Sequence, residues 1–287
     1  MSISSSAVLV ELNISVWTAE ILDKGETEKV TTDNNAGSKA AKVKKNLMAG
    51  TGDRKKIHDY AASCRNWHNE RTIPWSKRGP SLLATSLFMD YKTEANYRRD
   101  TFGAMVDTFV VNYPAMVQVA QYNAEGLGRM FDVNDYPAPS AIRDFFNFKL
   151  TFSPVPESGD FRLDVPAKEL EEVKQDYDNT FKSRLADAVR EPWNRLHGML
   201  TGISEKMTEP SESDKKKVYH ASLVTNAQDL CGLLTHLNIT KDPDLEKARK
   251  QLESTFQHVD IDTLRDSPEV REGLKNKVDA ILKQYEW

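Results

Sequence analysis

The sequence predicts a mainly α-helical protein with a small antiparallel β-sheet, an α+β fold. In this fold, long helices form a bundle packed on a β-hairpin plus the N-terminal strand. Three observations predict this class. Apolar residues recur at helical spacing over most of the chain, whereas strict alternation is confined to three short segments. The 287 residues also contain 11 Phe, 9 Tyr and 5 Trp, which is enough to fill a sizeable core.

The predicted strands rest on alternation. In residues 8–17, "VLVELNISVW", Val8 and Val10 fall on the face opposite to Leu9, which is typical of a half-buried strand. Residues 145–152 and 160–165 alternate in the same way around "SPVPESG", which predicts a hairpin with one apolar face. Because an isolated hairpin is marginal in water, the N-terminal strand is the expected third member of the sheet.

Helical spacing predicts the helices, and helix-breaking residues predict where they end. Pro114 is expected to end a helix and Pro192 to kink or split one, while "IPWSKRGPSLL" is expected to be a loop. Asp242 is expected to cap the helix that starts at Pro243. The expected helices are 19–48 with a break near "TTDNNAGS", 54–72, 85–113, 115–124, 166–208, 216–237, Pro243 to Phe256, and one or two closing helices from Asp260 onward.

The expected domain organisation follows from the polar stretch "TEPSESDKKK". Residues 1–208 are expected to form one helical domain containing the small sheet, because the sheet would tie the start of the chain to its middle. Residues 217–287 are expected to form a C-terminal helical region, either docked on that domain or semi-independent of it.

Composition excludes several classes of protein. The net charge of -4 argues against a dedicated nucleic-acid binder, since such proteins usually carry a basic excess. Two distant cysteines, Cys64 and Cys231, are neither a disulfide framework nor a four-thiolate zinc site. The N-terminus lacks the features of a signal peptide, and no apolar run reaches the length of a membrane span. We therefore expect a cytoplasmic protein.

The stretch "GTGDRKKIHDYAASCRNWHNERTIPW", from Gly50 to Trp75, resembles a phosphate loop only superficially. Its glycine spacing does not fit the Walker A pattern, so the glycines are expected to stop a helix. Cys64 and His68 are four residues apart and could be neighbours on a helix, but His58 falls on another face. Two ligands do not make a metal site, so we expect no metal and no cofactor.

No catalytic pattern stands out elsewhere. There is no G-x-S-x-G nucleophile elbow, and most carboxylates lie beside lysines or arginines, as on a solvated helix face. The protein is therefore expected not to be an enzyme, unless its catalytic residues converge only in three dimensions.

Two short segments are the candidate interaction sites. "HNERTIPW" places His68, Arg71 and Trp75 at the exit from a helix into a loop, where a recognition surface could form. The basic segment 39–56 could meet nucleic acid, although a charge run is more often a solvated face. Its candidate residues are Lys44, Lys45, Arg54, Lys55 and Lys56.

Four segments carry a resemblance to a family. They are "VELNISVWTA", "HNERTIPW", "MFDVNDYPAPSAIRDFFNFKLTFSPVPESGDFRLDV" and "LNITKDP". In their order, which covers nearly the whole chain, the sequence resembles uncharacterised proteins of bacteriophages and other mobile elements. Such families are often encoded near a MoxR-type AAA+ ATPase and a von Willebrand factor A-domain protein. The resemblance implies an adaptor or substrate of a remodelling machine in the host cytoplasm, and it carries no active-site residues.

The sequence as a whole predicts a non-enzymatic, phage-type accessory protein that acts through protein–protein contacts. A AAA+ ATPase or a von Willebrand factor A-domain protein is the expected partner. Two alternatives stay open, namely a nucleic-acid-transaction factor that uses the 39–56 segment and a structural component of a virion.

Overall fold

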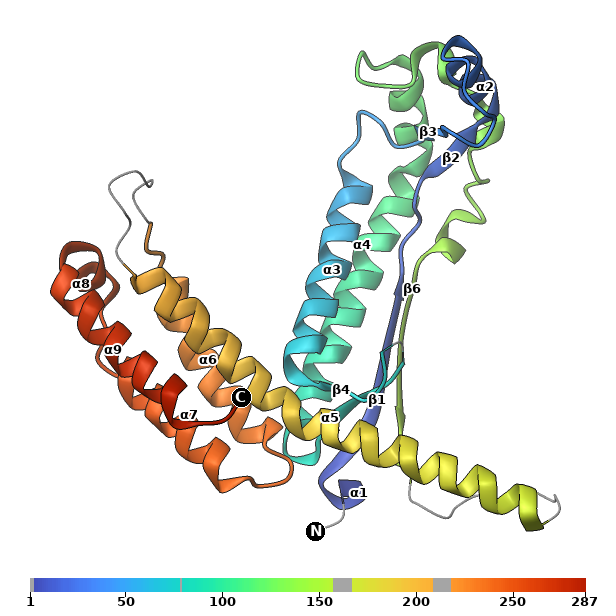
Figure 1. The fold of residues 1–287 in the computed structure, drawn as a ribbon. Helices are drawn as coiled ribbons and strands as arrows, with labels where there is room; N and C mark the ends of the chain where they lie inside the picture. Colours follow the sequence, from blue (N-terminus) through green and yellow to red (C-terminus); the bar gives the residue numbers. More distant parts are fainter. Residues whose placement is uncertain (1–2, 78, 157–166, 209–217) are drawn as a thin grey trace. The chain divides into compact units, whose positions relative to one another are not determined.

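A computed structural model describes residues 3–77, 79–156, 167–208 and 218–287 (Figure 1). The chain forms two compact units. Unit 1 consists of Met1–Glu11, His68–Tyr91 and Thr151–Trp287, and unit 2 of Leu12–Trp67 and Lys92–Leu150. The domain boundary expected between residues 208 and 217 stays a prediction. The two units divide the chain elsewhere, because each consists of segments that are separate in the sequence.

The predicted α+β class is confirmed. The helices are α1 (Ile3–Ser6), α2 (Lys24–Asp33), α3 (Asp53–Arg71), α4 (Phe88–Tyr122), α5 (Ala167–Met207), α6 (Ser222–Leu237), α7 (Pro243–Phe256), α8 (Ile261–Asp266) and α9 (Pro268–Gln284). The strands are β1 (Ala7–Ser15), β2 (Glu20–Asp23), β3 (Val43–Asn46), β4 (Ile73–Pro74), β5 (Ser81–Ala84) and β6 (Asn147–Ser153). Short 3₁₀ turns are η1 (Thr85–Leu87), η2 (Gly128–Met130), η3 (Val133–Asp135) and η4 (Ile142–Phe145).

The main sheet has the strand order β4-β5-β1-β6. The strands predicted at 8–17 and 145–152 are confirmed as β1 and β6, which are neighbours. Residues 160–165, the predicted third strand, lie outside the described residues. Leu9 and Val10 are both buried although they point to opposite faces, so the start of β1 is covered on both sides rather than half-buried.

The segment from Ile73 is not the expected loop. It forms the hairpin of β4 and β5, in which Ile73 pairs with Leu82 and Pro74 with Ser81. Proline cannot donate to a strand ladder, so Pro74 fits here only because β4 lies at the edge of the sheet. Sequence pattern missed this hairpin because the buried run at β5 is too short to show alternation.

The helix expected over 19–48 is confirmed only for Lys24–Asp33 and is wrong on either side of it. This region contains β2, α2 and β3, and the two strands pair from Glu20 opposite Asn46 to Asp23 opposite Val43. Asp23 caps α2 by accepting a hydrogen bond from the amide of Glu26 at 3.0 Å. Gly50 has a φ of 76°, so it closes a turn after β3 rather than stopping a helix.

Of the two helices next in the chain, one is as predicted and the other is longer. The helix predicted at 54–72 is confirmed as α3, and its face with Ile57 and Cys64 is buried. The helix expected to end at Pro114 instead continues as α4 to Tyr122. A proline inside a helix costs about 3 kcal/mol. Burial of Tyr113 and Met116 on either side of it offsets that cost.

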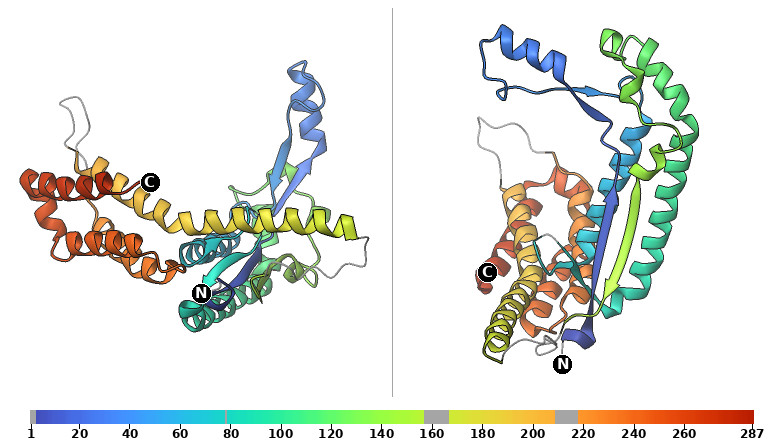
Figure 2. Two further views of the ribbon diagram at one scale, coloured as in Figure 1. Left: turned by 60° about the horizontal axis from the view of Figure 1, so that its bottom comes forward. Right: turned by 90° about the vertical axis from the view of Figure 1, so that its right-hand side faces the viewer.

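The C-terminal part of unit 1 is a bundle built from α5 and the four helices that follow it (Figure 2). Leu196, Leu252 and Val278 lie in its core, fully buried. Pro192 does not split α5, which is continuous from Ala167 to Met207. Asp242 caps α7 as predicted, accepting hydrogen bonds from two amides of the first turn.

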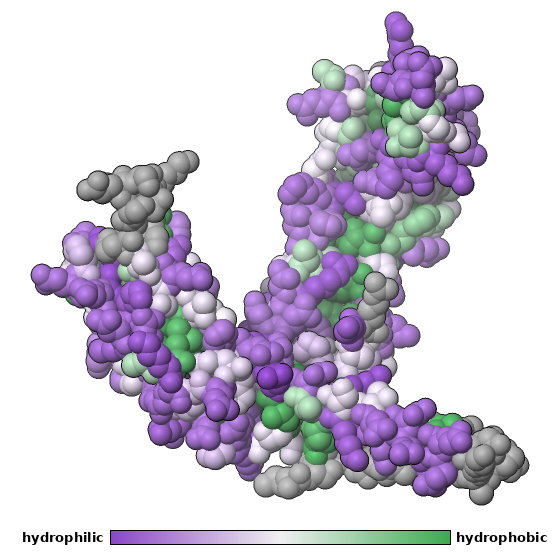
Figure 3. All heavy atoms as spheres, viewed as in Figure 1, coloured by the Kyte–Doolittle hydropathy of each residue, from purple (hydrophilic) through white to green (hydrophobic). Residues whose placement is uncertain are grey.

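Unit 2 has an aromatic core of its own, formed where α3, α4 and the strands meet. It contains Trp17, Phe109, Tyr113 and Phe146. On the face drawn in Figure 3 the surface is mostly hydrophilic, with hydrophobic residues emerging as separate areas. Among the described helices, none combines the length and the apolar character needed to cross a membrane.

Candidate functional site

The "HNERTIPW" segment does not present its histidine and tryptophan to solvent. His68 is 8% exposed and shares a 2.6 Å hydrogen bond with the hydroxyl of Tyr91. Burial lowers the pKa of His68 to about 4, so its ring is neutral at pH 7. Trp75 is 3% exposed and packs edge-on against Phe181. Arg71 is half-buried and contacts the carboxylate of Glu70 at 3.2 Å.

The positive charges of the basic segment 39–56 are largely paired with acceptors in unit 2. Arg54 donates to the backbone carbonyl of Trp17 at 2.9 Å, so its guanidinium is engaged in the fold. Three exposed lysines each face a carboxylate, and such exposed pairs contribute little to stability but do reduce the local positive charge. The pairs are Lys44 with Glu20 at 2.8 Å, Lys55 with Asp59 at 2.6 Å and Lys56 with Asp53 at 2.8 Å.

Lys45 points inward instead of toward a ligand. Its ammonium group contacts Asp135 and lies 3.6 Å from Asp23 and 3.3 Å from the carbonyl oxygen of Met130. The hydrogen bond to Asp135 raises the pKa of Lys45, which keeps it charged. This cluster joins β2 and β3 to η3, so its role is to hold unit 2 together.

The candidate binding site is an open groove along α5 and α6 in unit 1. Its free volume is about 620 Å³, which is within the range of ligand and peptide clefts. All of its lining residues belong to unit 1. They are Asn69, Glu70, Arg195, Gly198, Met199, Gly202, Ile203, Leu223, Leu230 and Leu233.

Two glycines form the floor of this groove. Gly198 and Gly202 are four residues apart on α5, so they lie on one face of the helix. A Cβ atom added at either position would meet no atom within 4 Å. Packing within unit 1 therefore does not require glycine at these two positions. Each glycine nevertheless destabilises the helix by about 0.5–1 kcal/mol relative to alanine. The result is helix backbone exposed at the bottom of the groove.

The walls of the groove are apolar. Leu223, Leu230 and Leu233 line it from α6, and Met199 and Ile203 line it from α5. Methionine is flexible and polarisable, which suits a surface that adapts to side chains of a partner.

One end of the groove is fixed by Arg195. Its guanidinium donates to the backbone carbonyls of Glu70 at 2.6 Å, Asn69 at 3.0 Å and Thr72 at 2.7 Å. Its Nε also donates to the carboxylate of Glu191 at 3.0 Å. Arg195 thus caps the last turn of α3, where a cation is favoured, and holds that turn against α5 as the rim of the groove.

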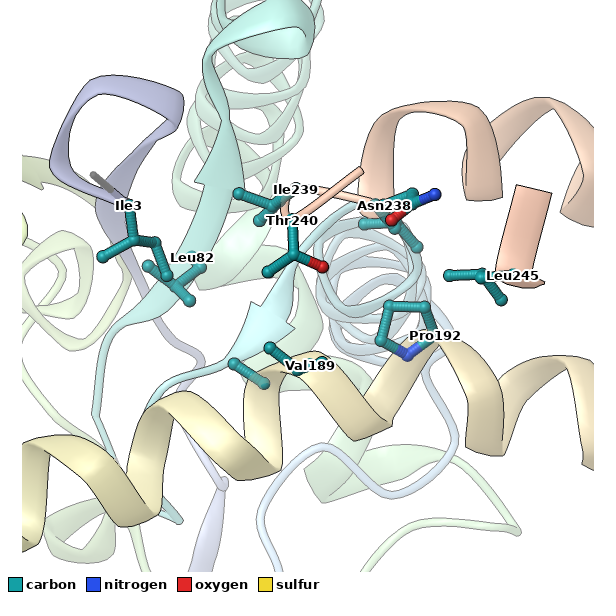
Figure 4. A pocket seen from close by; sticks show the side chains of 10 residues that line it. Ile3, Leu82, Val189, Pro192, Asn238, Ile239, Thr240 and Leu245 are labelled. Carbon is teal, nitrogen blue, oxygen red and sulfur yellow. The ribbon is translucent and has the colours of Figure 1, made fainter. Parts of the chain in front are cut away.

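The pocket of unit 1 in Figure 4 is too small for a ligand. It lies where Ile3, Leu82, Pro192 and Ile239 converge, and its free volume is about 10 Å³. This is no more than one water molecule needs. The pocket is therefore a packing defect beside the proline of α5.

The described residues contain neither a candidate metal site nor a reactive cysteine. Within them, no group of three or more His, Cys, Asp or Glu residues could hold a metal ion. Cys64 and Cys231 are both buried and unpaired with each other. Burial raises the pKa of the Cys231 thiol to about 11, so it stays protonated and unreactive at pH 7.

No protein-family model matches the chain, and no curated protein or solved structure matches it either. The resemblance to phage and mobile-element proteins therefore stays a prediction.

The sequence predictions placed the interaction surface at 68–75 and 39–56, so of the groove residues they included only Asn69 and Glu70 and missed those on α5 and α6. One signal could have found them, namely the pattern G-x-x-x-G from Gly198 to Gly202 inside a helix. Repeated glycine within a helix is unfavourable, so a pair at one-turn spacing indicates a use for the bare backbone.

Proposed function

We propose that this protein is a non-enzymatic adaptor that holds an amphipathic helix of a partner protein in the groove along α5 and α6. The observation that carries the proposal is the glycine floor between apolar walls. An amphipathic helix binds such a groove by laying its apolar ridge into it, with anchors spaced at three, four and seven residues.

The geometry supports a helix better than a small molecule. The groove is open along its length, and its polar groups are confined to the rim at Arg195, Glu70 and Asn69. A small-molecule site usually encloses its ligand and converges a few polar groups on it. Here the guanidinium of Arg195 is already engaged by three carbonyls, so recognition rests on shape and apolar burial.

The resemblance to phage-encoded proteins suggests which partners to test first. We propose a MoxR-type AAA+ ATPase or a von Willebrand factor A-domain protein, with this chain as its adaptor or substrate. Support for this finer proposal comes from the sequence resemblance alone.

Filling the floor of the groove tests the proposal. Gly202→Leu places a side chain in open space, so the fold is retained while the groove is blocked. The matched control is Gly273→Leu on α9, which is also an exposed helical glycine with nothing within 4 Å of an added Cβ. Both variants should gain the same helix propensity, so only the groove differs.

The tagged wild type, Gly202→Leu and Gly273→Leu are each mixed with the purified ATPase and A-domain proteins, and binding is measured by titration calorimetry. We expect binding by wild type and Gly273→Leu, and a loss of at least roughly tenfold in affinity for Gly202→Leu. Equal binding by all three variants would remove the groove from the interaction. No binding of either purified protein by wild type would end the ATPase and A-domain proposal, and affinity capture from host cells would then test the groove against other partners.

A further inference from the structure

The C-terminal half of α4, in unit 2, is unusual because it carries no charged residue after Asp107. Between Asp107 and Glu125 the sequence has 17 consecutive uncharged residues, "TFVVNYPAMVQVAQYNA". A surface helix normally places charged residues opposite its buried face. The inner side of α4 is buried through Phe109, Tyr113 and Met116, so a charged outer side would be expected.

Apolar, small and uncharged polar residues occupy that outer side instead. Val111 is 78% exposed and Tyr122 is 79% exposed. The right-hand view of Figure 2 shows one side of α4 lying along α3 and the strands and the other side facing away from them. Six exposed residues follow one another at intervals of four, three, four, three and four, and we call them the α4 stripe. They are Ala104, Thr108, Val111, Ala115, Gln118 and Tyr122.

This spacing is that of a coiled-coil seam, in which two positions of every seven face a partner helix. The positions that flank a seam are often Glu or Lys, which keeps a solvated helix soluble. Along the α4 stripe the flanking positions from Asn112 to Gln121 are uncharged. Asp107 is the flanking charge, and its carboxylate is paired with Arg143 of the same unit.

The stripe is complementary to itself when two copies run antiparallel. With a two-fold axis at the level of Tyr113, Tyr122 of one copy lies opposite Ala104 of the other. Val111 then lies opposite Ala115, and Thr108 opposite Gln118. Each layer joins a larger side chain to a smaller one, which is how facing positions fill space without voids.

We propose that the α4 stripe is a self-association surface, on which a second copy of this chain docks with its α4 antiparallel. Such an isologous contact presents the same patch twice, so any net charge on it would be repelled by its own copy. The absence of charge from Thr108 to Ala124 removes that repulsion. A partner of different sequence could carry the opposite charge, so binding it would not require the stripe to be uncharged.

The dimer should be weak. The stripe from Ala104 to Tyr122 spans about 27 Å at 1.5 Å per residue. A single helix of that length covers less than the roughly 800 Å² per partner of a standard stable interface. We therefore expect a reversible dimer whose population depends on protein concentration.

Exchanging two side chains across the two-fold axis tests the proposal in the full-length chain. Ala104→Tyr alone sets two tyrosines against each other, and Tyr122→Ala alone leaves a gap, so each should weaken the dimer by roughly tenfold. The double variant restores a tyrosine opposite an alanine and should recover dimerisation. Sedimentation velocity over a range of concentrations, with circular dichroism to confirm the fold, measures these effects.

A charge at the centre of the stripe gives the second measurement. Val111→Lys places like charges near the axis and should abolish the dimer. Val133→Lys in η3, where the wild-type valine is 63% exposed, is the control and should dimerise like wild type. Gly202→Leu should also leave dimerisation unchanged, which separates this proposal from the groove. A wild-type chain that remains monomeric at roughly 200 μM would overturn the proposal. So would a dimer that survives Val111→Lys, or a double variant no better than its single parents.

Discussion

The bundle of unit 1 and the body of unit 2 bury charge in different ways. In the bundle, the buried Arg249 pairs with glutamates three and four residues away on its own helix, and Arg271 donates to the carbonyl of Leu264. In unit 2, Lys45 is buried between Asp23 and Asp135, which come from segments far apart in the sequence. The bundle is thus held by apolar packing with local ion pairs, whereas in unit 2 an ion cluster links distant segments.

The largest effect should follow from truncating the apolar core of the bundle. Leu252 is fully buried on α7, in the cluster that joins it to α5 and α9. Leu252→Ala should lose about 4 kcal/mol of unfolding free energy, since it removes apolar burial and leaves a cavity. Urea unfolding followed by circular dichroism measures this loss. Leu252→Met, which conserves volume, is the control and should lose less than about 1.5 kcal/mol.

Removing the central cation should destabilise unit 2 almost as much. In Lys45→Met, the carboxylates of Asp23 and Asp135 remain half-buried without their counter-charge. The expected loss is about 3 kcal/mol, because breaking a buried pair leaves uncompensated charge. The control Lys44→Met removes an exposed pair with Glu20 and should cost less than about 1 kcal/mol. Equal losses for the two lysines would contradict the contrast between the units.

Lowering the pH should reduce the stability of unit 1, because His68 is buried in its neutral form. The pKa of His68 in the folded chain is about 4, below the ordinary value of about 6.5, because burial disfavours the charged ring. Its contribution to stability is complete above pH 6.5 and is lost as the pH falls toward 4. By pH 5 the loss should be about 2 kcal/mol. Urea unfolding between pH 7.5 and 5 should show a smaller decrease for His68→Asn than for wild type.

Helices with one charged and one apolar face were predictable from the sequence. The periodicity of α3, and of α7 with its Asp242 cap, predicted their existence and their buried sides correctly. These helices obey local rules, since their caps and spacing are set by residues within a few positions of one another. β1 and β6 were predicted for the same reason, because alternation over seven or more residues is visible locally.

Features set by distant partners were not predictable. Lys45 reads as part of a basic run, and only Asp23 and Asp135 make it a buried residue of a strand. Pro114 reads as a helix end, and only packing of its neighbours carries α4 through it. The candidate groove depends on α5 lying beside α6, which the glycine spacing signals only once both helices are in place.

The smallest loss of unfolding free energy should follow from removing Asp242, the charged residue that caps α7. Asp242 accepts hydrogen bonds from the amides of Asp244 at 2.9 Å and Leu245 at 3.3 Å, and from the indole of Trp193 at 2.9 Å. Asp242→Ala should lose about 1–2 kcal/mol, since it leaves helix amides and a half-buried indole without their acceptor. Asp242→Asn keeps one acceptor oxygen for the two helix amides, but its NH2 group cannot accept from the Trp193 indole, so it should retain about half of that stability. A full loss in the asparagine variant would mean that the charge of Asp242, rather than its hydrogen bonds, stabilises the start of α7. The bundle would then depend on charge as unit 2 does.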